Sequence, residues 1–260
     1  MNDFLSFARD HGLIMDHVIA DGRVHRVRTE TKPRKRNGAY AFDNVRGFVQ
    51  DWTVHPSAIP YRDGSPKPSA ARLNRAQGVS ADAKAAELLA GQIIARSAFL
   101  PHPYLARKGF PQLAGLVDDG RLIVPMYAAP HCRRVVSVQR IAEDGSKLFL
   151  RGGVAKDAVY HLGRGSTDVL VEGYATGLSV RAAMTALYRD CRVVVCFSAG
   201  NLASVARLYP RAFVVADNDV SKAGELAAMQ AGLPWVMPPV VGMDFNDMHQ
   251  QEGLTAAVEL

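Results

Sequence analysis

Cysteine is scarce in this sequence, and the cysteines that occur form no paired motif. The three are Cys132, Cys191 and Cys196, and no two of them have C-x-x-C spacing. An odd number of cysteines at such spacings excludes a disulfide framework and a four-cysteine zinc site. We therefore expect reduced thiols and no bound zinc.

Long apolar runs are also missing. No stretch approaches the roughly 18 apolar residues that a membrane span requires, and no apolar run follows a basic start as in a signal peptide. The phosphate-binding sequence G-x-x-x-x-G-K-[ST] does not occur, which excludes a fused helicase motor. We expect a soluble, cytoplasmic protein with no membrane partner.

The sequence does contain enough apolar material for a core. Apolar residues make up 48% of the 260 residues and charged residues 22%, which is typical of one large domain or two small ones. The charge is uneven, because residues 1–80 hold 13 of the 31 Lys and Arg but only 8 of the 25 Asp and Glu. A polyanionic partner near the N-terminus would explain this imbalance.

The positive charge is concentrated in residues 23–36, where seven Lys and Arg stand against the single acid Glu30. Such a run can contact several phosphates without reading base sequence. The alternative is a solvated basic loop with no partner. The candidate DNA-binding residues are Arg26, Arg28, Lys32, Arg34, Lys35 and Arg36.

Turn signals and composition predict four parts. The first is a small basic β-rich unit with turns at Asp21-Gly22 and Asn37-Gly38, and the second is a linker rich in Pro, Ser and Arg. The third combines a helix over 80–98 with antiparallel strands near 122–125, 134–138 and 147–150. The boundaries of the four parts are 1–55, 56–79, 80–160 and 161–260.

Strands and helices alternate in the last part. Apolar runs at 168–171, 192–197, 212–216 and 234–237 each read as a buried strand followed by a helix. This alternation predicts right-handed crossovers and a parallel sheet flanked by helices. The fold class is therefore α/β, with an antiparallel α+β part before the parallel sheet.

Carboxylates follow three of these strands. Glu172 closes the first, Asp217 and Asp219 close the third, and Asp244 with Asp247 follows the fourth. Because functional groups gather at the carboxyl ends of parallel strands, we expect these acids to lie close together. Converging carboxylates need a compensating cation, and hard oxygen ligands suit Mg²⁺ or Mn²⁺.

Two motifs make this region resemble a known family. Val169-Leu-Val-Glu172-Gly-Tyr-Ala-Thr-Gly-Leu-Ser179, followed by Val214-Val-Ala-Asp217-Asn-Asp219, is similar to the Toprim domain of bacterial-type primases, topoisomerases and some nucleases. With Asp244-Phe-Asn-Asp247, the pattern looks most like the Toprim primases of phages and plasmids. Upstream, His102-Pro-Tyr-Leu-Ala-Arg-Lys-Gly109 and the strands over 122–150 resemble the preceding part of a primase catalytic core.

The resemblance implies roles for the matching residues. Glu172, Asp217 and Asp219 would be catalytic and would hold Mg²⁺ or Mn²⁺, and Asp244 and Asp247 would bind a further metal or orient the others. Basic residues that face nucleotide phosphates in such cores correspond to Arg140 and Lys147, with Lys222 as a further candidate; a plain surface role is the alternative for each.

The chain departs from that family at two points. Many bacterial primases carry another acid four residues after the motif glutamate, where this sequence has Thr176. They also begin with a zinc ribbon, whereas residues 1–55 here resemble one reduced to its hairpins, without cysteine.

Three functions are compatible with these features. The first is a primase-type nucleotidyltransferase that makes short RNA primers on single-stranded DNA from NTPs, with a separate helicase as a partner. The second is a Toprim nuclease that directs water at a phosphodiester. The third is an accessory protein that binds single-stranded DNA without catalysis.

Overall fold

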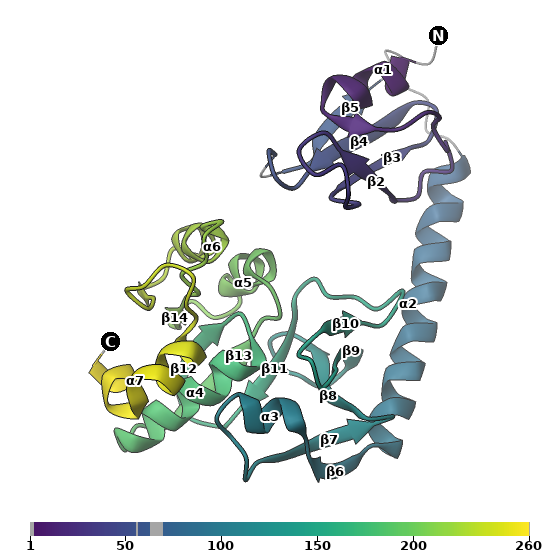
Figure 1. Cartoon of the computed structure of the whole chain (residues 1–260). Coiled ribbons are helices and arrows are strands. Elements are labelled where there is room, and N and C mark those ends of the chain that lie inside the picture. The colour runs from purple at the N-terminus through teal and green to yellow at the C-terminus, as the bar shows by residue number, and fades with distance from the viewer. Residues whose placement is uncertain (1–2, 56, 63–69, 260) are drawn as a thin grey trace. The chain divides into compact units, whose positions relative to one another are not determined.

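The computed structural model describes residues 3–55, 57–62 and 70–259 (Figure 1). The chain forms two compact units, Met1–Val79 and Ser80–Leu260. The helix α2 (Ala70–Arg96) begins ten residues before the residue 80 expected from the sequence, within the segment 56–79 that was expected to be a linker. Residues 56 and 63–69 of that segment lie outside the described residues.

The first unit is an antiparallel sheet packed on one helix. Its strands pair in the order β1-β2-β3-β4-β5, and β5 continues the sheet past residue 55, where the sequence had placed the end of this part. The rings of Phe4 and Phe42 stack 4.3 Å apart, and Leu13 and Val49 complete the core. The bounds are α1 Asp3–Asp10, β1 Leu13–Ile14, β2 His25–Thr29, β3 Gly38–Phe42, β4 Arg46–Asp51 and β5 Ile59–Arg62.

The second unit is built on one mixed sheet of ten strands. Its main path runs β10-β9-β8-β11-β13-β12-β14-β15, with β7 joining β6 to β8. The bounds are β6 Ala98–Pro101, α3 Pro103–Arg107, β7 Ala114–Asp118, β8 Arg121–Ala128, β9 Val135–Ile141, β10 Lys147–Phe149, β11 Ala158–Leu162, β12 Thr167–Val171, α4 Tyr174–Ala186, β13 Cys191–Val195, α5 Ala199–Ala206, β14 Phe213–Val215, α6 Ala223–Ala231, β15 Trp235–Val236 and α7 Phe245–Glu259.

The predicted α/β class is confirmed, because β13, β12, β14 and β15 are parallel and the strands from β6 to β10 are antiparallel. The sequence suggested two separate sheets for these two parts, but in the structure they form one sheet. The strand β11 pairs antiparallel with β8 on one side and with β13 on the other. It crosses the expected boundary at residue 160 and makes the sheet continuous.

Helices cover both faces of the parallel strands (Figure 1). Along β12, Val169 and Val171 enter the core on the α4 side, whereas Leu170 enters the core that holds Leu202 and Val205 of α5. The helix α4 packs against α7, and α5 packs against α6. A strand that is apolar on both faces follows from this sandwich, which explains the unbroken apolar runs.

Candidate active site

The direction in which successive parallel strands are added to the sheet reverses at β12. The chain passes from β12 through α4 to β13 on one side, and then through α5 to β14 on the other side of β12. Val171 and Val215 are paired across β12 and β14. Glu172 and Asp217 therefore leave adjacent strands at the same edge, in the crevice where α/β sheets bind their ligands.

Asp217 is the most perturbed acid of this edge. Its Oδ1 is buried and has no hydrogen-bond partner among the described residues. Burial, together with the negative charges of Glu172 and Asp244, raises the pKa of Asp217 to about 7, although Lys147 opposes this shift. A buried carboxylate oxygen without a donor is costly, and a cation is the partner that would compensate it.

Glu172 lies in the same electrostatic field. Burial raises its pKa, and the charges of Asp219 and Asp244 act in the same direction. Lys147 and the backbone N–H of Ala199, at the start of α5, partly stabilise the charged form. The carboxylate thus faces both the other acids and the N-terminus of a helix.

Asp219 is held differently, by donors of its own loop. Burial acts to raise its pKa, but the Ser221 hydroxyl and the N–H groups of Gly224 and Ala223 outweigh it, so the pKa is below its usual range. The Gly224 N–H donates to Oδ2 at 2.9 Å. Asp219 is therefore ionised at a pH at which Asp217 is only partly ionised. The two neighbouring acids thus differ in their protonation.

The loops after β14 and β15 are tied together by Asn218. Its N–H donates to the Met243 carbonyl at 3.0 Å, and its side-chain amide donates to the Pro238 carbonyl at 2.8 Å. These bonds place Asp244, which follows Met243, beside the Asp217 loop. Asp244 of the third acidic motif is thus brought to the edge that holds Asp217.

Asp244 and Asp247 also cap α7. The N–H of Asp247 donates to Oδ1 of Asp244 at 2.8 Å, and the N–H of Asp244 donates to Oδ2 of Asp247 at 3.3 Å. The other oxygen of Asp247 pairs with Nζ of Lys108 at 3.3 Å. Asp247 is therefore occupied on both oxygens, and capping accounts for part of this motif.

The predicted phosphate-binding residues do not lie together. Lys147 is opposite Ile141 and Leu148 is opposite Arg140, so Lys147 and Arg140 project from opposite faces of the sheet. The charge of Lys147 lowers the pKa values of Glu172 and Asp217, whereas the charge of Arg140 lowers the pKa of Asp118. Lys222 pairs with Glu225 at 3.9 Å on the exposed end of α6.

Tyr104 and Lys108 of the α3 segment reach the acids but were given no role from the sequence. The Tyr104 hydroxyl is buried without a partner among the described residues, and burial, with the charge of Asp244 nearby, raises its pKa to about 12. Both residues belong to the upstream motif over 102–109, which could have indicated a functional role. Only the fold shows that this motif packs beside the acids.

The acids fit a hard cation by donor type. Glu172, Asp217, Asp219 and Asp244 offer oxygen only, and Asp217 holds an uncompensated buried oxygen. Within the described residues, no three His, Cys, Asp or Glu side chains are already arranged as a metal-binding group. Thr176, in place of the additional family acid, is buried in the first turn of α4.

The predicted DNA-binding residues of the first unit are exposed. Arg26 and Arg28 project from β2, and the Arg26 guanidinium lies 4.0 Å from the ring centroid of the exposed Trp52. Tyr40 and Phe42 are core residues of the same sheet. The remaining predicted DNA-binding residues are exposed after β2, at Lys32, Arg34, Lys35 and Arg36. None of the helices in the described part of the chain is long and apolar enough to cross a membrane.

Comparison with known proteins gives a family for part of the chain. Residues 168–255 match the model of the Toprim domain. No curated protein matches the chain.

Several solved structures are similar at low identity. A chain of the bacteriophage T7 lagging-strand DNA polymerase complex with gp4 primase domains, an RNA/DNA hybrid and dTTP is 14% identical over 63% of this chain and 92% of that chain, with a TM-score of 0.42. The bacteriophage T7 primase fragment is 19% identical over 55% and 64%, with a TM-score of 0.41. The E. coli primase catalytic core is 16% identical over 70% and 73%, with a TM-score of 0.37.

Function is therefore inferred from the residues of the site. Glu172, Asp217, Asp219, Asp244 and Asp247 all fall inside the matched range, at one edge of its parallel strands. Residues 168–255 form a Toprim domain.

Proposed function

We propose that this chain is a primase-type nucleotidyltransferase that synthesises short RNA primers on single-stranded DNA. The observation that carries the proposal is the set of carboxylates at the switch point of a Toprim sheet, with Asp217 buried and uncompensated. Glu172, Asp217 and Asp219 would hold Mg²⁺ or Mn²⁺, and Asp244 would hold or orient a further ion. A bound ion would activate an attacking hydroxyl and stabilise charge on phosphate oxygens.

The chain's own residues supply the rest of the proposed site. Lys147, at the start of β10, lies near enough to stabilise the charged forms of Glu172 and Asp217, and its ammonium is suited to the phosphates of an incoming nucleotide. A triphosphate carries more negative charge than a phosphodiester, so such a cation is of more use to a transferase than to a nuclease. This placement favours the transferase over the nuclease.

The first unit supports template binding in this proposal. Its exposed basic residues can follow the phosphates of a single strand, and Trp52 with Arg26 offers a ring on which a base could stack. Contacts of this kind are independent of base sequence. The template would therefore be held by charge and stacking, and delivered by a separate helicase.

Primer synthesis on single-stranded DNA with labelled NTPs and Mg²⁺ or Mn²⁺ tests the proposal. We expect short products from the native chain and none from the double variant Asp217→Ala/Asp219→Ala. Asp190→Ala is a matched control, because Asp190 is an exposed carboxylate at the opposite, amino-terminal edge of β13. That variant should retain full synthesis.

Other results would replace the proposal. Metal-dependent fragments of the template, without primers, would identify a nuclease. Bound but intact template, with no products even when helicase is added, would identify a non-catalytic binding protein.

A further inference from the structure

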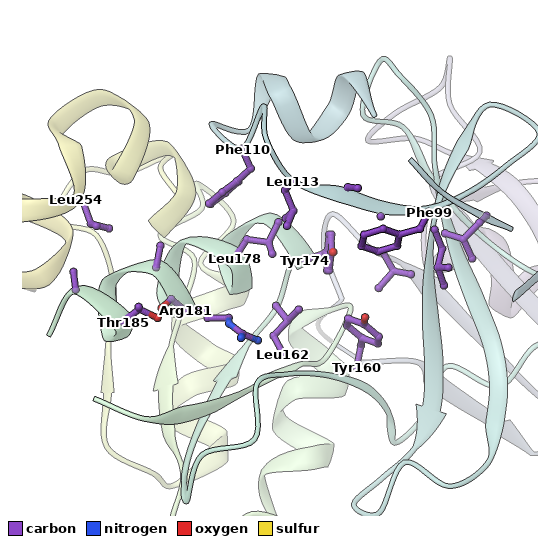
Figure 2. Close-up of a pocket in the computed structure, with 17 residues that line it drawn as sticks. Phe99, Phe110, Leu113, Tyr160, Leu162, Tyr174, Leu178, Arg181, Thr185 and Leu254 are labelled. Atoms are coloured by element: carbon purple, nitrogen blue, oxygen red, sulfur yellow. Dashed lines mark hydrogen bonds between the residues drawn. The ribbon is translucent and has the colours of Figure 1, made fainter. Parts of the chain in front are cut away.

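The second unit holds a cavity of about 700 Å³ on the α4 side of its sheet (Figure 2). Phe110 and Leu113 form one wall, Tyr160 and Leu162 of β11 form another, and Leu178 of α4 lies between them. Its volume is in the range of pockets that enclose small molecules, which is roughly 300–1,000 Å³. None of the candidate catalytic acids lines it.

The lining is mostly apolar, with one charged side chain. Arg181 is the only Asp, Glu, Lys or Arg among the residues that line the cavity. The polar group of Thr185 is already used, because its hydroxyl donates to the Arg181 carbonyl at 2.8 Å. The guanidinium is thus the charged group that a bound molecule would meet, beside two tyrosines of the lining, Tyr160 and Tyr174.

Arg181 has no carboxylate within ion-pair distance among the described residues. In this it differs from Arg96, Arg192 and Arg207, which pair with Asp118, Asp168 and Asp157. An arginine beside apolar walls favours an anion, since the guanidinium fork matches carboxylate and phosphate oxygens.

The guanidinium of Arg181, an exposed residue, lies beside Gly163. A Cβ added at Gly163 would be 3.3 Å from Nη1 of Arg181 and 2.6 Å from the Cys191 carbonyl oxygen. The bare glycine, whose φ is +82°, therefore leaves the space that the guanidinium occupies beside β11. Figure 2 shows the side chain directed toward Leu162 and Tyr160.

We infer that this cavity binds a small amphipathic anion, with an apolar body against Phe110, Leu113 and Leu178 and a single carboxylate or phosphate on Arg181. The site goes beyond the proposed function, because it shares no residue with the acid edge. It adjoins that edge through α4, which begins at Tyr174, two residues after Glu172, and carries Leu178 and Arg181.

Two fluorescent probes with the same aromatic body test this inference in the full chain. 8-Anilinonaphthalene-1-sulfonate carries one negative charge, and N-phenyl-1-naphthylamine carries none. We expect saturable binding of both to the native chain. Arg181→Gln should raise the Kd of the anionic probe at least tenfold and change that of the neutral probe by less than twofold.

Two kinds of control variant separate this site from others. Ala182→Trp fills the cavity and should abolish saturable binding of both probes; Thr185→Trp serves the same purpose if the first variant does not fold. Arg211→Gln removes an exposed arginine outside the lining and should leave both Kd values unchanged. Displacement of the anionic probe by decanoate or by decyl phosphate then distinguishes the two headgroups.

The inference fails on any of three results. These are an unchanged Kd for the anionic probe in Arg181→Gln, saturable binding that survives both tryptophan variants, and no displacement by either alkyl anion. All three readouts are binding measurements, so they are independent of whether the chain makes primers.

Discussion

Gly224 lies directly against the backbone of Asp217. A Cβ added at Gly224 would be 2.1 Å from the carbonyl oxygen of Asp217 and 3.1 Å from its nitrogen. Only glycine lets the first turn of α6 approach the end of β14 this closely. The N–H of Gly224 also donates to Asp219, so one glycine sets the position of both acids of the Asp-x-Asp motif.

Gly224→Ala should therefore damage the site without removing any acid. We expect the free energy of unfolding to fall by roughly 2–4 kcal/mol, since the clash is with backbone, and primer synthesis to fall at least tenfold. Thermal unfolding and the primer assay measure the two effects. Gly200→Ala is the matched control, because a Cβ there would meet nothing within 4 Å. Equal behaviour of the two variants would contradict this role.

The raised pKa of Asp217 predicts an unusual pH dependence of stability. Between pH 4 and about 7 the folded chain keeps a proton on Asp217 that the unfolded chain has released, so this group stabilises the fold at low pH and ceases to do so as pH rises through 7. Asp217→Asn should therefore stabilise the metal-free chain at pH 8, by roughly 1–3 kcal/mol, and change little at pH 4.

Thermal unfolding in EDTA at the two pH values measures this difference, with Asp190→Asn as a control that shows no pH-dependent gain. Added Mg²⁺ should raise the Tm of the native chain at pH 8 and not that of Asp217→Asn. The same change in Tm at pH 4 and pH 8 would show that Asp217 titrates normally.

Lys147 and Arg140 should differ in nucleotide binding because they project from opposite faces of the sheet. We expect Lys147→Ala to raise the KM for NTP about tenfold, equivalent to about 1.4 kcal/mol, because alanine cannot bind a phosphate as the ammonium does. Arg140→Ala and Lys222→Ala should leave this KM within twofold. Steady-state primer synthesis at varied NTP concentration measures it, and a larger effect of Arg140→Ala would reverse the assignment.

The basic segment should bind single-stranded DNA through counterion release. Replacing Lys32, Arg34, Lys35 and Arg36 by Ala should weaken binding and reduce the slope of log K against log salt, by about 0.7 for each phosphate that is no longer neutralised. Fluorescence anisotropy of a labelled oligonucleotide at several salt concentrations measures this slope. Trp52→Ala should weaken binding by roughly 1–3 kcal/mol with little change in slope. An unchanged slope in the first variant would exclude the segment from the interface.

The parallel strands and their terminal acids were predictable because burial on both faces leaves a plain signal. Val169-Leu-Val171 is an unbroken apolar run that ends at a carboxylate, and such a run is typical of a strand buried between two layers of helices. Right-handed crossovers then predict a parallel sheet with these acids at one edge, whereas the strand order that makes β12 and β14 neighbours is seen only in the structure.

The strands β6, β7 and β11 were missed for a physical reason. The side chains of β6 are exposed, and β7 shows no strict alternation, so neither has the period of a half-buried strand. β11 takes its place from two partners distant in sequence, which no local pattern encodes. The opposite faces of Arg140 and Lys147 depend on hairpin register, and a slip of one residue between β9 and β10 would put both on the same face.

The single sheet also determines how the molecule can move. Since β11 is hydrogen-bonded to β8 and to β13, the strand that carries Lys147 and the strands that end in the acids are parts of one hydrogen-bonded framework. A bound nucleotide would meet a fixed span between ammonium and carboxylates. The loops after β14 and β15 lie outside this strand framework and are joined to each other through the two hydrogen bonds of Asn218.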